Sequence, residues 1–349
     1  MRYIRVSFYE RNHVSSGRVT IADVAKRAGV STAAVSKVLR DAYGVSEAMQ
    51  LKVRAAIEEL GYRPHAAARA MRGRTYTLGV LLSDTRNPFF PDIIEGLIEQ
   101  LADTEYQVLL GPGGVEPATQ ARMTDAMIDR SMDGLVLISP VIADADLAAL
   151  AAAVPVVVVG RHGSASAYDA VVDDDVMGAG LVVEHLAALG HRAIGHITHL
   201  DRGRAHGLPH AVRAEGYRQA MTARGLEPQV VATSFSEEGG YRGALELLAS
   251  DRPPTAIFAG ADVAALGVLR AADEAGLSVP DDLSVAGYDN IGIASLKRIS
   301  LTSVDQDGRV IGATAAKLLV ERIEGRNSAV VSSVSPGLIV RGTTGPPRS

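Results

Sequence analysis

From Thr77 onward the chain repeats one pattern, in which short apolar runs alternate with stretches of helical periodicity. Continuous runs rich in Val, Ile and Leu, separated by helices, are typical of parallel strands buried on both faces. The pattern therefore predicts an α/β fold of the doubly wound kind. The eight runs are LGVLLS, YQVLLG, GLVLIS, PVVVVG, AIGHIT, QVVATS, TAIFAG and LSVAGY.

The repeating part spans about 270 residues, which is more than one hydrophobic core usually holds, so we expect two lobes. Both lobes would lie within 78–349. Ligands of open α/β sheets bind beyond the carboxyl ends of the strands. The residues that follow each run are therefore the candidates for a binding site.

The charge of the first part of the chain is opposite to that of the rest. Residues 1–75 contain 14 Lys and Arg against 6 Asp and Glu, a net charge of +8, and the remainder carries −13. A basic module ahead of an acidic body indicates a polyanionic partner for that module alone. Within it, residues 1–18 are predicted to be a disordered leader.

Residues 19–62 hold two short helical patterns, back to back, and a third that follows them. Thr20 is a good N-cap, with Asp23 three residues later as a weaker form of the capping box, and Gly29 ends the first pattern. Ser31 caps the second, whose apolar side faces the first. A third helix is expected from Ser46 to about Leu60. Helices this short are unstable alone, so we predict a packed helix-turn-helix headpiece.

Composition excludes several classes of protein. There is no Cys, which rules out disulfides and thiolate metal sites and fits a reducing cytosol. No apolar run reaches the about 18 residues of a membrane span. We therefore expect no membrane partner and a cytoplasmic location.

Eight motifs, in this order, resemble the lac repressor family of bacterial transcription regulators over about 19–346: TIADVAKRAGVSTAAVSKVL, ELGYRP, NPFF, EHLAALGHRAIGHI, RAEGYRQAM, VPDDLSVAGYDN, LTSVDQ and LIVRGTTGPP. The resemblance implies a DNA-binding headpiece, a hinge helix at 63–77, and an effector-binding core at 78–349 similar to periplasmic sugar-binding proteins. Lobe one of that core is expected at about 78–176 and 305–335, and lobe two at about 177–304 and 336–349. It also implies a homodimer. No heptad tail follows the last motif, so a dimer is the simpler expectation. Function is then expected to be ligand-responsive repression at a pseudo-palindromic operator, with a sugar or a related metabolite as the effector.

The second helix of a helix-turn-helix reads the major groove with its first residues. The Thr32 hydroxyl and methyl and the Ala33 methyl suit base edges, and Lys37 suits a guanine or a phosphate. In the hinge, Met71 falls where the family places an apolar wedge in the minor groove, and neighbouring arginines would flank phosphates. The predicted DNA-binding residues are Thr20, Ser31, Thr32, Ala33, Ser36, Lys37, Arg69, Met71 and Arg72.

Two of the five Phe residues are adjacent, Phe89 and Phe90, directly after the first predicted strand. They either seal a helix onto the sheet or offer a stacking wall to a ring, and both roles can hold if one points inward. Phe235 would be the opposite wall. Polar residues after other strands would orient the ligand, with Arg213 expected to open a helix. The predicted effector-binding residues are Asn87, Phe89, Phe90, Arg161, Arg213, Phe235, Asp262, Asp289 and Gln306.

Two other classes of protein are alternatives to a repressor. An enzyme on a Rossmann-like fold needs a cofactor fingerprint and a proton-transfer pair, and GPGG at 111–114 lacks the Gly-Lys-Ser/Thr ending of a phosphate loop. We therefore predict no enzymatic activity, no cofactor and no metal site. The run DDD at 173–175 is interpreted as a solvated turn. The other alternative is a sugar-binding protein with a vestigial headpiece, which operator binding would distinguish.

Overall fold

The computed structural model describes residues 19–39, 44–62, 73–163, 166–200 and 206–348. Contacts divide the chain into two compact units, Met1–Arg74 and Thr75–Ser349. The predicted leader at 1–18 and most of the predicted hinge at 63–77 lie outside the described residues. No helix among the described residues is long and apolar enough to cross a membrane.

The first unit contains three short helices, α1 (Ile21–Ala28), α2 (Thr32–Val38) and α3 (Glu47–Leu60). Thr20 and Asp23 form a reciprocal capping box, and Gly29 ends α1 in the left-handed conformation at φ 67°. The predicted caps at Ser31 and Ser46 are also present, each accepting a backbone N–H of the first turn. These caps confirm the predicted helix-turn-helix.

The headpiece has its own small hydrophobic core. Val24, Val35 and Val53 are its fully buried centre, one from each helix, with Ala25 and Ala56 where the helices approach closely. A surface pair joins α1 to α3, since Arg27 donates to Glu59 at 2.7 Å. The three helices are therefore held by mutual burial, as their shortness requires.

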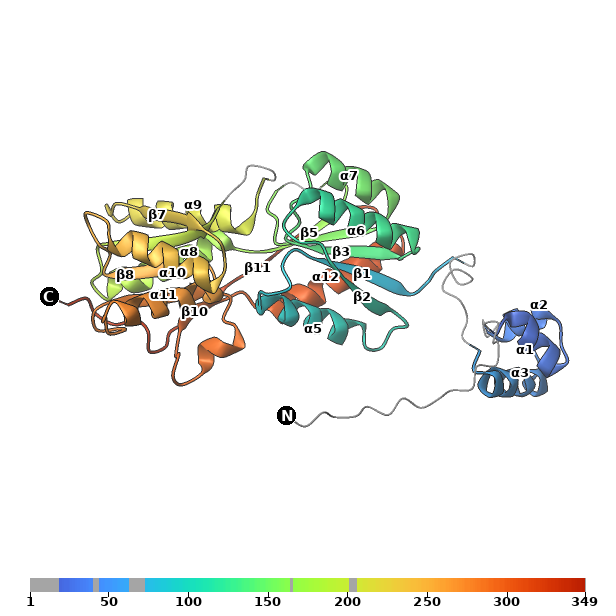
Figure 1. Ribbon diagram of the computed structural model, residues 1–349. Helices are drawn as coiled ribbons and strands as arrows, with labels where there is room; N and C mark the ends of the chain where they lie inside the picture. Colours follow the sequence, from blue (N-terminus) through green and yellow to red (C-terminus); the bar gives the residue numbers. More distant parts are fainter. Residues whose placement is uncertain (1–18, 40–43, 63–72, 164–165, 201–205, 349) are drawn as a thin grey trace, which may run out of the picture. The chain divides into compact units, whose positions relative to one another are not determined.

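Lobe one of the second unit is a six-stranded parallel sheet in the order β11-β5-β4-β3-β1-β2. Helices α5 and α12 cover one face and α6 and α7 the other (Figure 1). The apolar side chains therefore alternate between two cores. The strands are β1 (Thr77–Leu82), β2 (Gln107–Pro112), β3 (Gly134–Ile138), β4 (Val156–Val159), β5 (Asp169–Asp173) and β11 (Val331–Val334), and the helices are α5 (Phe89–Leu101), α6 (Pro117–Asp129), α7 (Asp144–Ala153) and α12 (Gly308–Ile323).

Lobe two repeats this plan with the sheet order β12-β10-β9-β8-β6-β7, in which only the short β12 is antiparallel to its neighbour β10. Helices α8 and α9 cover one face, and α10 and α11 the other. The strands are β6 (Ile194–His199), β7 (Gln229–Thr233), β8 (Ala256–Ala259), β9 (Ser284–Tyr288), β10 (Thr302–Asp305) and β12 (Gly337–Ile339), and the helices are α8 (Asp175–Ala188), α9 (Pro209–Thr222), α10 (Glu237–Leu248), α11 (Asp262–Glu274) and the 3₁₀ turn η1 (Gly292–Ser295).

The chain passes between the lobes three times, from β5 to α8, from β10 to α12, and from β11 to β12. All eight predicted runs are strands, and the two doubly wound lobes are confirmed. Four further strands were not predicted, β5, β10, β11 and β12. Each has at most five residues and contains Asp, Ser, Thr or Gly, so no continuous apolar run marks it.

The interpretation of 173–175 as a solvated turn is wrong. Asp173 ends β5 and is 2% exposed, and Asp175 begins α8 and is fully buried. Three acidic residues in a row read as a solvated turn in the sequence, but here the run crosses from one lobe to the other. Charged side chains remain buried there because partners from distant segments surround them, as described below.

Candidate functional site

The exposed face of α2 is the part of the headpiece available to a partner. Thr32, Ala33 and Lys37 are exposed, Ser36 is half-buried, and the apolar side of the helix packs inward. The Thr20 and Ser31 hydroxyls both serve as helix caps, accepting from Asp23 N at 3.4 Å and Ala34 N at 3.1 Å. Contact of any of these residues with DNA stays a prediction. The remaining three predicted DNA-binding residues, Arg69, Met71 and Arg72, lie outside the described residues.

The second unit contains a cavity of about 670 Å³, and both lobes line it. Its walls come from the carboxyl ends of β1, β3 and β4 in lobe one and of β6, β7 and β9 in lobe two. This is the position that open α/β sheets offer to a ligand. The size lies within the range of pockets that bind small molecules.

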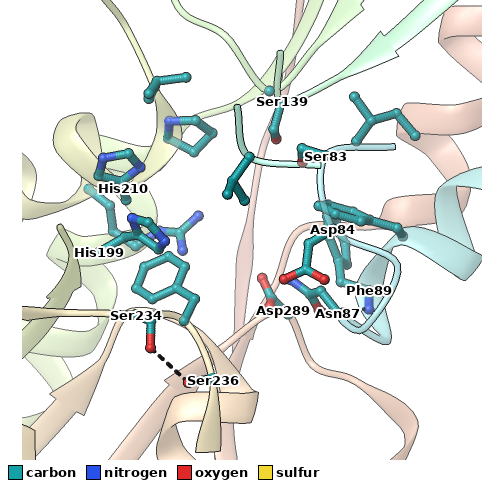
Figure 2. Close-up of a pocket in the computed structure, with 18 of the residues that line it drawn as sticks. Ser83, Asp84, Asn87, Phe89, Ser139, His199, His210, Ser234, Ser236 and Asp289 are labelled. Atoms are coloured by element: carbon teal, nitrogen blue, oxygen red, sulfur yellow. Dashed lines mark hydrogen bonds between the residues drawn. The ribbon is translucent and has the colours of Figure 1, made fainter. Parts of the chain in front are cut away.

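Seven of the nine predicted effector-binding residues line this cavity, and two do not. Figure 2 shows Asn87 and Phe89 from lobe one beside Asp289, with His199, His210 and Ser234 of lobe two opposite. The seven are Asn87, Phe89, Phe90, Arg213, Phe235, Asp289 and Gln306.

The cavity has an aromatic wall on each side. Phe89 and Phe90 open α5 with ring centroids 6.3 Å apart, and the Asn87 side chain accepts the Phe89 backbone N–H at 3.0 Å. Both Phe side chains are buried and both line the cavity, so sealing the helix and lining the site are not alternatives. Opposite them, Phe235 meets the His199 ring edge-on at 5.4 Å. Such walls suit a flat or ring-shaped ligand.

Asp289 and Gln306 form a polar corner of the cavity. Asp289 follows β9 with φ 111°, and its Oδ1 accepts from Gln306 Nε2 at 2.6 Å. Its Oδ2 is buried and has no hydrogen-bond partner among the described residues. Burial raises the pKa of the Asp289 carboxyl well above its ordinary value. A ligand hydroxyl would satisfy this oxygen, and a buried polar atom without a partner costs about 1–3 kcal/mol.

Arg161 does not line the cavity, contrary to the prediction. It follows β4 after Gly160, which has φ 68°, and its guanidinium is buried inside lobe one. There it donates to Ile142 O and to Asp144 Oδ1, both at 2.5 Å. These contacts hold Arg161 against the segment after β3, and its Nε also donates to His206 O of lobe two at 3.2 Å.

Asp262 is likewise outside the cavity lining. As the first residue of α11 it is fully buried below β9 and β10, where Oδ1 accepts from Ser303 Oγ at 2.6 Å and Oδ2 from Ile291 N at 2.9 Å. Burial raises the pKa of Asp262 to about 7. Asp262 thereby joins strand β10 to the segment that follows β9. The adjacent Gly287 leaves room for the carboxylate, since a Cβ there would lie 2.1 Å from Oδ1.

Replacing Asp262 with Asn should change how stability depends on pH. The raised pKa means that the folded protein binds this proton more tightly than the unfolded chain, so wild type loses stability as the pH rises towards 7. From pH 5 to pH 8 the unfolding free energy of the variant minus that of wild type should rise by about 2–3 kcal/mol. Urea denaturation at both pH values measures this. Asp273→Asn, an exposed change on the same helix, should show no such trend.

Two aspartates and one histidine lie close together below the cavity, where the chain first passes from lobe one to lobe two. A ring nitrogen of His162 and one carboxylate oxygen each from Asp173 and Asp175 lie within 4.8 Å of one another. The Arg213 guanidinium stands beside them and donates from Nε to Asp175 Oδ1 at 2.9 Å. Since Arg213 is a fixed cation beside Asp175, these side chains form an ion-pair cluster.

The comparisons with known proteins agree with this architecture. Residues 20–65 match "Bacterial regulatory proteins, lacI family", and residues 183–344 match "Periplasmic binding protein-like domain". The HTH-type transcriptional repressor PurR of Erwinia tasmaniensis is 36% identical over 331 residues, covering 92% of this chain and 96% of the relative. The chain belongs to the lacI family of bacterial regulatory proteins. It is a DNA-binding transcriptional repressor and not an enzyme.

Solved structures of lacI-family proteins show the same fold. The lac repressor dimer bound to operator and the anti-inducer ONPF is 27% identical with a TM-score of 0.81, covering 94% of this chain and all of that one. The complex of transcriptional regulator CelR with cellobiose is 30% identical with a TM-score of 0.70, covering 93% of this chain and all of that one. The sequence resemblance to the lac repressor family is thus confirmed.

Several cavity residues of this lacI-family chain were not predicted. His199 and His210 flank Phe235, Ser139 follows β3, and Thr233 ends β7 with its buried hydroxyl unpartnered among the described residues. His199, Ser139 and Thr233 lie at strand ends, so the rule applied to the other strands would have found them. His210 is the second residue of α9, which begins at Pro209 and not at Arg213 as expected. Only the tertiary contact between α9 and β6 marks it.

Proposed function

We propose that the chain acts as a homodimer that binds a pseudo-palindromic operator and that a small molecule in the cavity sets its affinity for that DNA. The observation that carries the proposal is the two-lobed cavity, in which aromatic walls face one another and polar groups lie between them. The dimeric, operator-bound state described for the lac repressor supports the assembly. The site of action is the cytoplasm, at the nucleoid.

The cavity chemistry favours a sugar or a related hydroxylated metabolite. Ring faces stack on Phe89 and Phe235, and hydroxyls pair with groups such as Asp289 Oδ2 and Thr233 Oγ1, which have no partner among the described residues. The relative CelR was solved with cellobiose, a molecule of this class. A ligand that binds one lobe arrangement better shifts the population of arrangements and, through it, operator affinity.

On the DNA side, Thr32, Ala33 and Lys37 would read the major groove from the start of α2. Thr20, Ser31 and Ser36 would approach phosphates. In the hinge, Met71 would be the minor-groove wedge, with Arg69 and Arg72 on phosphates. These assignments follow the family pattern and are tested by substitution.

A thermal-shift screen of sugars, nucleosides and related metabolites tests the effector site. A ligand at 100 times its Kd should stabilise the core by about 2.7 kcal/mol. The same ligand should then change binding to a duplex from the DNA upstream of the gene. A ligand that stabilises the core but leaves DNA binding unchanged would separate the cavity from repression and contradict the proposal.

Replacing Lys37 with Ala should weaken operator binding about tenfold and lower the salt slope by about one. The reason is the loss of one exposed cation from the DNA-reading face of α2. Fluorescence anisotropy with a labelled duplex at several salt concentrations measures both. The matched control Lys52→Ala removes an exposed cation from α3. Equal losses in the two variants would show that Lys37 has no special position.

A further inference from the structure

Five side chains form what we call the interlobe cluster: His162, Asp173, Asp175, Arg213 and Tyr288. They lie where the chain leaves β4, where it passes from β5 to α8, on α9, and at the end of β9. His162 and Asp173 belong to lobe one, and the other three belong to lobe two. Asp173, Asp175, Arg213 and Tyr288 are buried, and His162 is partly exposed.

Two hydrogen bonds of the cluster cross from one lobe to the other. The Tyr288 hydroxyl donates to Asp173 Oδ2 at 2.6 Å, and His162 Nε2 lies 2.7 Å from Asp175 Oδ2. Within lobe two, Arg213 holds Asp175 from the other side at 2.7 Å and stacks its guanidinium on the Tyr288 ring at 3.4 Å. Separation of the lobes at this edge would therefore leave buried polar groups without partners.

The segments beside the cluster also contact each other from one lobe to the other. His162 N donates to Gly207 O at 2.7 Å, and Arg161 Nε donates to His206 O at 3.2 Å. A Cβ on Gly207 would lie 1.8 Å from His162 O, so the two segments are in direct contact. A close-packed edge of this kind has discrete arrangements and does not deform continuously.

The fixed charges of the cluster do not balance. Asp173 and Asp175 are two carboxylates, and Arg213 is the one permanent cation within the cluster. A buried cluster becomes neutral only when one more proton is held within it. The direction of the Asp173 shift agrees, because burial and the neighbouring Asp175 raise the pKa of Asp173 to about 6.

Among the described residues, the surroundings supply no other group that would remove this imbalance. Beside the cluster, Arg161 pairs with Asp144, Asp174 caps α8, and Asp289 is a further carboxyl facing Arg213 and Asp173. Strand β11 brings no titratable side chain against β5, and at the far end of β5 Asp169 holds Arg322 and Arg326 of the α12 segment.

We propose that the interlobe cluster is a proton-linked joint, in which uptake of one proton stabilises the arrangement where Asp173 and His162 contact lobe two. Asp175 acts as a positioning residue that holds Arg213 at the floor of the cavity. Since Asp173 and Arg213 also line the cavity, a bound ligand touches the same groups that join the lobes. Joining of the lobes and ligand binding are then linked to the same proton.

The test measures the distance between the lobes directly and needs no knowledge of effector or operator. The chain has no native Cys, so spin labels at Ala149→Cys on α7 and Ala223→Cys at the end of α9 report on this edge in the full-length protein. Pulsed electron–electron double resonance measures the distances between the two labels and gives the ratio of the joined population to the separated one. Between pH 8 and pH 5.5 that ratio should rise about threefold, because a pKa of about 6 in the joined arrangement and about one unit lower in the separated arrangement produces that change over this interval.

Two variants separate the joint from a general effect of pH. Asp173→Asn keeps an acceptor for Tyr288 and removes the excess charge, so its ratio should be the same at both pH values and at least as high as that of wild type at pH 5.5. Tyr288→Phe removes a cross-lobe hydrogen bond and should lower the ratio at both pH values. The control Asp146→Asn, exposed on α7, should respond as wild type does.

A ratio that is the same at both pH values in wild type would overturn the proposal. So would an Asp173→Asn variant that titrates like wild type, or a Tyr288→Phe variant with an unchanged ratio. A loss of response in Asp146→Asn would also overturn it, because the response would then not belong to the cluster. Operator binding enters none of these outcomes, so a failed joint leaves the proposed function standing, and the reverse holds too.

Discussion

Replacement of Arg213 by Met is expected to lower the unfolding free energy of the core by about 3–5 kcal/mol. Met keeps most of the apolar stem but removes the cation that is bound to Asp175 and stacked on Tyr288. Asp175 is fully buried, so its charge would then lie between His162 and the like-charged Asp173, and Asp173 would lose the same cation. Breaking one side of a buried pair costs far more than the pair contributes.

Urea denaturation of the core at pH 7 measures this loss. The matched control is Arg218→Met on the same helix, where the side chain is 46% exposed and lies 3.7 Å from Glu215. That exposed pair should contribute less than about 1 kcal/mol. Similar losses in the two variants would show that the buried cluster contributes nothing special. Because Arg213 lines the cavity, stabilisation by effector should also disappear in the Met variant.

Replacement of Asp169 by Asn is expected to cost about 3 kcal/mol in the same transition. Asp169 is fully buried at the start of β5 and accepts from Arg322 at 2.9 Å, from Arg326 at 2.6 Å, and from Val330 N at 2.8 Å. Asp169 thereby attaches the end of α12 and the segment leading into β11 to the start of β5. Asn keeps the shape but removes the charge that both arginines bind.

The pH dependence of this loss provides a second check. Burial acts to raise the pKa of Asp169, but the hydrogen bonds from Arg326 and Arg322 outweigh it and hold the pKa below its ordinary value. The stabilisation is therefore present above the ordinary pKa of Asp and is lost as the pH falls through the lowered value. The gap between wild type and variant should shrink in acid. Glu321→Gln, which removes an exposed partner of Arg326, should cost less than about 1 kcal/mol.

The candidate site shows which site residues a sequence pattern can place and which it cannot. The rule that ligands bind beyond strand ends placed Phe89, Asp289 and Gln306 correctly around one cavity. The same rule failed for Arg161, because Ile142 O and Asp144 hold its guanidinium outside the cavity lining. It failed for Asp262 because Ser303 of β10 and the Ile291 backbone bind that carboxylate inside the lobe. Strand order predicts which edge a residue is on, and tertiary partners decide where its side chain lies.

The sequence by itself determined what depends on neighbours along the chain. Capping residues such as Thr20 and Ser31 and the apolar runs specify the headpiece helices and eight of the strands, because caps and hydrophobic periodicity act over a few residues. Only the tertiary structure decided what depends on distant segments: the polar strands such as β5, the aromatic pairing of His199 with Phe235, and the burial of Asp173 and Asp175. A charged residue is buried only where partners far away in sequence compensate its desolvation, and local sequence carries no record of those partners.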